Sequence, residues 1–66
     1  MMRYAKQEYK DTSHTDYYKV HSDGTYDMYT NGWRHFDEQF QWGESNEWMG
    51  FIVTELTEND FFLEMV

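Results

Sequence analysis

Residues 17–36 read YYKVHSDGTYDMYTNGWRHF, and this stretch decides the fold. It contains three short segments rich in aromatic residues, separated by Ser22-Asp23-Gly24 and Thr30-Asn31-Gly32. Short aromatic segments with Gly-containing loops between them are typical of strands joined by tight hairpins. The stretch therefore predicts a three-stranded antiparallel meander over residues 17–21, 26–29 and 33–36.

Loop length fixes which residues of this meander face each other. A three-residue loop ending in Gly forms when a type I turn is followed by a left-handed residue. The alternative two-residue loops would set Val20 and Phe36 opposite Asp27, which would place a charged side chain in the same row as apolar core residues. We therefore prefer loops over 22–24 and 30–32. The preferred register predicts two core-facing rows, which are Val20, Tyr26 and Phe36, and Tyr18, Met28 and Arg34.

The opposite side of the meander carries two further rows. In the first, Asp27 has Lys19 on one side and His35 on the other, which predicts a cross-strand ion pair. The second row is aromatic, and it either packs under another layer or forms an exposed patch for a partner. Its members are Tyr17, Tyr29 and Trp33.

The C-terminal residues predict a strand followed by a helix. Trp48 to Glu55 has the composition of a central strand that joins the meander. Thr57-Glu58-Asn59-Asp60 has the form of a capping box, which predicts a helix over residues 58–66 with Thr57 as its N-cap. We expect this helix to turn Phe61, Phe62 and Met65 toward the sheet, and Glu58 and Glu64 toward water. A final strand in place of the helix is the alternative.

Residues 2–10 show no single periodicity, so strand and helix are almost equally compatible with them, and we favour an edge strand. No linker divides the chain. Together these elements predict one α+β domain over residues 1–66, with a small antiparallel sheet of three to four strands and a short C-terminal helix. An all-β domain is the alternative.

Composition defines the class of protein. The chain has 66 residues, no Cys, and three Trp, six Tyr and five Phe. A chain this short buries only about 60% of its unfolded surface, so large aromatic side chains must supply most of the core. The absence of Cys excludes disulfides and thiolate zinc sites and fits a reducing, cytoplasmic setting. No apolar stretch approaches the roughly 20 residues of a membrane span.

The net charge of -8 comes from the second half of the chain. Residues 1–34 hold all five Lys and Arg side chains and five carboxylates, whereas residues 35–66 hold eight carboxylates and no Lys or Arg. A one-sided negative field repels nucleic acid and anionic membranes and attracts basic protein surfaces. We therefore expect a basic protein partner, plausibly a nucleic-acid-binding complex, with a homodimer as a further option.

The sequence predicts no enzyme, metal site or cofactor. The Ser residues lie in loops without a nucleophile-elbow pattern. The His residues lack the spacing of a known metal site. In the predicted register His21 and Asp37 flank Thr25, which allows only a weak contact, so we expect structural or exposed histidines.

A very short, cysteine-free, acidic and aromatic-rich chain resembles, in class, the small inhibitors that bacteriophages and mobile elements encode against host defence nucleases, including anti-CRISPR proteins and DNA mimics. The resemblance implies that carboxylates occupy a Lys/Arg-lined nucleic-acid site while aromatic residues act as anchors. The candidate acidic residues are Asp37, Glu44, Glu47, Glu55, Glu58, Asp60 and Glu64. The candidate anchors are Tyr17, Tyr29, Trp33, Trp42 and Trp48. The alternative is a small interaction or accessory module whose acidic face only provides solubility.

Overall fold

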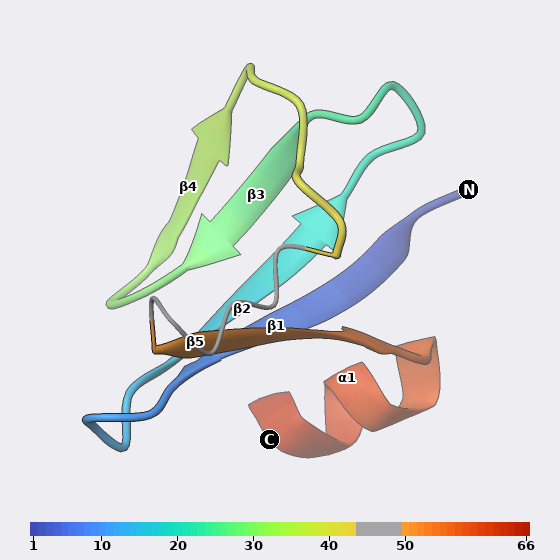
Figure 1. Ribbon diagram of the computed structural model, residues 1–66. Coiled ribbons are helices and arrows are strands. Elements are labelled where there is room, and N and C mark those ends of the chain that lie inside the picture. The colour runs from blue at the N-terminus through green and yellow to red at the C-terminus, as the bar shows by residue number, and fades with distance from the viewer. Residues whose placement is uncertain (44–49) are drawn as a thin grey trace.

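A computed structural model describes residues 1–43 and 50–66 as a five-stranded antiparallel sheet with one helix (Figure 1). The sheet has the strand order β4-β3-β2-β1-β5. This architecture confirms the α+β prediction, although the sheet has five strands and not the three to four expected. The elements are β1 (Arg3–Tyr9), β2 (Thr15–Val20), β3 (Tyr26–Tyr29), β4 (Trp33–Phe36), β5 (Phe51–Leu56) and α1 (Glu58–Met65).

The meander has the predicted register. Tyr26 pairs with both Val20 and Phe36, as three-residue loops require. In the first loop the Gly24 amide donates to the His21 carbonyl at 2.9 Å and Gly24 has a φ of 92°, so a type I turn is followed by a left-handed residue. The second loop differs, because Asn31 (φ 61°) precedes Gly32 (φ 127°) in a left-handed conformation of its own. Asn tolerates this conformation better than most residues.

The first strand is central, so the prediction of an edge strand was wrong. β1 pairs with β2 on one side and with β5 on the other. Both faces of β1 are covered, which is why the neighbouring residues Tyr4 and Ala5 are both buried. β5 joins the sheet through β1 rather than through the meander, and it begins at Phe51. Trp48 and Met49 of the predicted strand lie outside the described residues.

The two faces of the sheet carry separate apolar clusters. On one face, residues 37–43 cover a core of Ala5, Tyr18 and Val20, against which Phe40 and Trp42 pack. We call it the loop face. The helix covers the other face, which we call the helix face. There Phe61 is 2% exposed, and its ring centroid lies 4.6 Å from that of Tyr4.

The helix begins where the sequence predicts. Thr57 is extended and its Oγ1 accepts a hydrogen bond from the Asp60 amide at 3.1 Å, so Thr57 is the N-cap. The orientation of Phe62 was predicted wrongly, because this side chain is 54% exposed. Glu64 is exposed as predicted, but its carboxylate also accepts a hydrogen bond from Tyr17, because a helix places residues three apart, such as 61 and 64, on one side. Within the described residues no helix is long and apolar enough to cross a bilayer.

Candidate interaction surface

The sheet order separates the candidate acidic residues. Asp37 follows β4 at one edge of the sheet, whereas Glu55 lies in β5 at the opposite edge. Glu58, Asp60 and Glu64 belong to α1, which follows β5 (Figure 1). The candidate residues Glu44 and Glu47 lie outside the described residues. The described carboxylates therefore form a group on β5 and α1, with Asp37 apart from it.

Bases of the first half pair with two members of this group. The Arg3 guanidinium donates to both carboxylate oxygens of Glu55 at 2.8 Å, and this hydrogen bonding holds the pKa of Glu55 below its ordinary value. Lys6 Nζ lies 3.1 Å from Glu64 Oε2, and Tyr17 donates to the same carboxylate at 3.0 Å. Part of the acidity of the second half is thus neutralised within the fold.

Other carboxylates of the set have no Lys or Arg partner within residues 1–43 and 50–66. Glu58 accepts a hydrogen bond from the Tyr4 hydroxyl at 3.2 Å, and Asp60 is exposed in the first turn of the helix. The Asp37 side chain is 93% exposed and lies against His35. These three carboxylates are open to a partner.

Three cationic side chains lie over aromatic rings. The Arg3 guanidinium also lies 3.9 Å from the Trp42 ring centroid, and Lys19 Nζ lies 4.4 Å from that of Trp33. The Arg34 guanidinium lies over Phe36 at 5.7 Å. The quadrupole of an aromatic ring attracts a cation held over its face.

The candidate anchors have different environments. Tyr29 and Trp33 are 37% and 40% exposed, and their ring centroids are 5.2 Å apart. The helix covers Tyr17, whose ring centroid lies 6.3 Å from that of Phe61. Trp42 packs against the core of the loop face. Trp48 lies outside the described residues. The Trp33 ring centroid lies 6.2 Å from that of Phe61, so the helix contacts both ends of the row, while Tyr29 and Trp33 remain partly exposed.

An apolar patch on the helix was missed by the sequence analysis. Phe62, Leu63 and Val66 are 54%, 68% and 106% exposed. Phe62 and Leu63 lie in α1 and Val66 is its C-cap, and we call this exposed apolar group the outer helix side. The sequence analysis would have predicted this patch if it had assigned Phe61 to the core and left Phe62 out.

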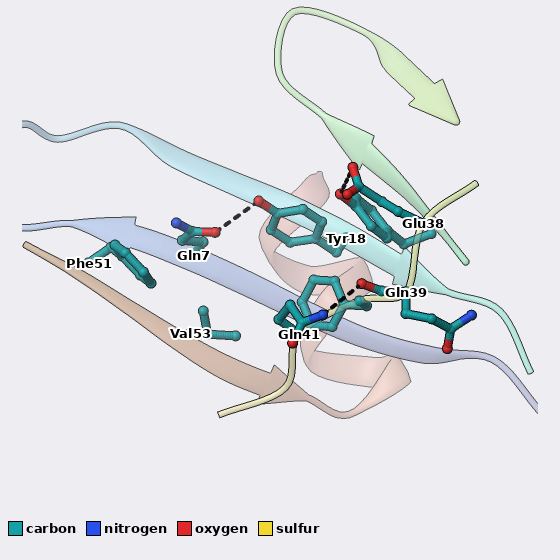
Figure 2. Close-up of a pocket in the computed structure, with 9 residues that line it drawn as sticks. Gln7, Tyr18, Glu38, Gln39, Gln41, Phe51 and Val53 are labelled. Atoms are coloured by element: carbon teal, nitrogen blue, oxygen red, sulfur yellow. Dashed lines mark hydrogen bonds between the residues drawn. The ribbon is translucent and has the colours of Figure 1, made fainter. Parts of the chain in front are cut away.

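A small hollow lies on the loop face (Figure 2). Its volume is about 220 Å³, below the roughly 300–1,000 Å³ of typical ligand pockets. Its polar groups bond to one another, since Tyr18 donates to Gln7 at 2.9 Å and Tyr26 donates to Glu38 at 3.1 Å. This hollow offers little unsatisfied hydrogen-bonding capacity, so it is a weak candidate for a ligand site.

A histidine and carboxylate cluster lies on the helix face of the meander. Asp27 Oδ1 lies 2.6 Å from His35 Nδ1, and Asp27 Oδ2 lies 3.1 Å from His21 Nε2. Partial burial alone would raise the pKa of Asp27, but these hydrogen bonds hold it below its ordinary value. Asp27 and Asp37 together raise the pKa of His35.

This cluster corrects the predicted contacts of Asp27 and His21. The predicted row of Lys19, Asp27 and His35 is present, but Lys19 lies over Trp33 and His21 bonds to Asp27. His21 is two residues beyond Lys19 on the same face, so it lies diagonally across from Asp27. Diagonal neighbours are within reach of long side chains, and that geometry could have revealed the contact.

No protein-family model, curated protein or solved structure matches this chain. The function must therefore be inferred from its own residues.

Proposed function

We propose that this protein is a small acidic inhibitor that binds a basic protein surface. The observation that carries the proposal is that at least four of the five Lys and Arg side chains interact within the fold. Arg3 and Lys6 pair with carboxylates, and Lys19 and Arg34 lie over aromatic rings. With a formal net charge of -8, the outward field is then dominated by carboxylates. Such a field accelerates encounter with positively charged partners.

The expected mode of inhibition is mimicry of nucleic acid. The carboxylates would occupy a Lys/Arg-lined surface on which the partner otherwise binds phosphates. Within the candidate set, Asp37, Glu58 and Asp60 should contribute most, because no Lys or Arg pairs with them in the described part of the chain. Glu55 and Glu64 would first have to leave Arg3 and Lys6, so their contribution should be smaller.

Affinity capture tests this proposal. The immobilised protein is exposed to a lysate of the cells in which it acts, and bound proteins are identified by mass spectrometry. We expect a nucleic-acid-binding protein that is released by added salt and by competing duplex DNA. The triple variant Asp37→Asn, Glu58→Gln and Asp60→Asn should lose it, whereas the matched neutral change Asn59→Gln should not. Mimicry would be contradicted by a partner that still binds DNA while it is bound to this protein. It would also be contradicted by a partner whose binding to this protein does not weaken with added salt.

The second candidate function is an interaction or accessory module that binds through apolar contacts. The exposed outer helix side favours it, because apolar side chains gathered on a surface often mark a protein interface. Under this alternative Phe62→Ser with Leu63→Ser abolishes partner capture and the triple acidic variant does not. A homodimer of this kind would appear in sedimentation velocity as a mass that falls on dilution.

A further inference from the structure

Three strand ends bring two imidazoles and one carboxylate together on the helix face of the meander. His21 immediately follows β2, Asp27 lies in β3 and His35 lies in β4. Asp27 and His35 are direct cross-strand partners. One ligand atom from each of the three residues can be chosen so that all lie within 4.8 Å of one another. Backbone pairing thus holds a compact set of donor atoms in place.

The separations suit a small cation. Metal bonds of about 2.0–2.2 Å to nitrogen and oxygen place the ligands of a tetrahedral site roughly 3.3–3.6 Å apart. The Asp27 oxygens now lie 2.6 Å from His35 Nδ1 and 3.1 Å from His21 Nε2. Side-chain rotations that change the two Asp27 contact distances by less than about 1 Å would give that geometry. The strand pairing does not have to change.

A fourth residue orients one of the imidazoles. His35 Nε2 lies 2.9 Å from Asp37 Oδ1, on the side of the ring away from Asp27. Metal-ligating histidines almost always donate their second ring N–H to a carboxylate, carbonyl or water, which fixes the tautomer. Without a metal, Nδ1 of His35 is hydrogen-bonded to Asp27; an ion would replace the Nδ1 proton while Nε2 continues to donate to Asp37. This outer contact is independent of the three donors and itself points to a ligand.

We propose that His21, Asp27 and His35 bind a divalent first-row transition-metal ion, with Zn²⁺ as the expected occupant and Asp37 as the residue that positions His35. Two imidazole nitrogens and one carboxylate oxygen suit zinc, whereas Mg²⁺ and Ca²⁺ take oxygen ligands. Three protein ligands leave a fourth position for water or for a partner's side chain. The ion would tie β2, β3 and β4 together in a chain that has no Cys for disulfides.

Calorimetric titration of EDTA-treated, desalted protein with ZnCl₂ tests the site directly. We expect saturable binding of one ion per chain, a higher melting temperature with Zn²⁺, and no such effect from Mg²⁺ at the same concentration. In ¹H–¹⁵N spectra of the imidazoles, the His21 and His35 signals should shift on addition of Zn²⁺ while His14 stays unchanged. This readout needs no substitution, so it does not depend on a variant folding.

Variants separate this site from adventitious binding to surface histidines. His21→Gln and His35→Gln should each weaken Zn²⁺ binding by more than tenfold, and Asp37→Asn by about tenfold, at the low end of outer-contact effects because Asp37 is exposed. The control is His14→Gln, since His14 also contacts a carboxylate, with Nε2 2.6 Å from Asp16 Oδ1. Circular dichroism confirms that each variant folds. Absence of saturable binding in the wild type, or an equal loss in His14→Gln, overturns the proposal.

Discussion

Arg3 and Glu55 form a two-contact ion pair between neighbouring strands, although 52 residues separate them in the chain. Nε and Nη2 of the guanidinium each donate to one carboxylate oxygen at 2.8 Å. The two side chains are 50% and 48% exposed, so solvent screens the pair and its contribution to stability is small. Its geometry nevertheless aligns β5 with β1.

Acid should remove the stability that this pair supplies. Hydrogen bonding to Arg3 lowers the pKa of Glu55 in the folded state. The contribution is therefore present above the unfolded-state pKa and is lost as pH falls through the lower, folded value. Urea unfolding midpoints at pH 6 and pH 3 should differ less in Glu55→Gln than in the wild type. An equal difference in both proteins would exclude Glu55 as a source of acid sensitivity.

Alkaline pH should destabilise the protein through its tyrosines. Burial, followed by the hydrogen bond to Asp16, raises the pKa of Tyr9 to about 12, and burial also raises the pKa of Tyr18. The unfolded chain loses these protons near its ordinary tyrosine pKa, so stability falls as pH rises from about 10 through the folded value. Unfolding followed by circular dichroism between pH 9 and 12 measures this loss. Tyr9→Phe should reduce it.

Phe61 and Phe62 are adjacent, yet they should respond very differently to truncation. Phe61 is 2% exposed, on the side of the helix that packs against the sheet. Phe61→Ala should therefore lower the free energy of unfolding by about 3–5 kcal/mol. Phe62 is 54% exposed, so Phe62→Ala should change it by no more than about 0.5 kcal/mol. Chemical denaturation of both variants checks the orientation of the helix. Similar losses would mean that the helix is rotated relative to the sheet.

The helix N-cap gives a further test. Thr57→Ala removes the acceptor of the Asp60 amide and should cost about 0.5–2 kcal/mol of stability. Thr57→Ser keeps a hydroxyl at the same place and serves as the control. The difference between the unfolding free energies of the Thr57→Ala and Thr57→Ser variants measures the contribution of the capping hydrogen bond. No difference would show that the hydroxyl does not cap the helix.

The two hairpin glycines should differ in their tolerance to a side chain. Both have positive φ, so Val is strained at either position. A Cβ at Gly24 would also collide with the Gln39 carboxamide, whereas a Cβ at Gly32 meets no atom within 4 Å. We expect Gly24→Val to lower the melting temperature more than Gly32→Val. Adding Gln39→Ala to Gly24→Val should recover part of the loss, and no recovery would assign the whole effect to the backbone.

Local signals account for the parts of the fold that the sequence predicted correctly. Loop length, chosen from the apolar pattern of the strands, sets Tyr26 opposite Val20 and Phe36, and Thr57 with Asp60 marks the helix start within four residues. Neither depends on the rest of the chain. The same holds for the rows on both faces of the meander, since strand periodicity follows once the register is set.

Long-range pairing accounts for what the sequence did not predict. Nothing near residues 3–9 indicates that β5 will cover the second edge of β1, so a central strand was expected at the edge. The contacts of Glu64 with Lys6 and Tyr17 were not predicted, because both residues are far away along the chain. The His21 contact was missed because only directly opposed residues were compared, and it is diagonal to Asp27.

The position of β1 between β2 and β5 has a consequence for synthesis on the ribosome. Translation at about 5–20 residues per second separates the emergence of β1 from that of β5 by roughly 2–8 s. In addition to the edge at β4, the sheet presents β1 as an unpaired edge until β5 is made. Lys6 and Glu8 carry charges along that edge. Charged side chains discourage edge-to-edge association, so they protect the unfinished sheet until its last strand is made.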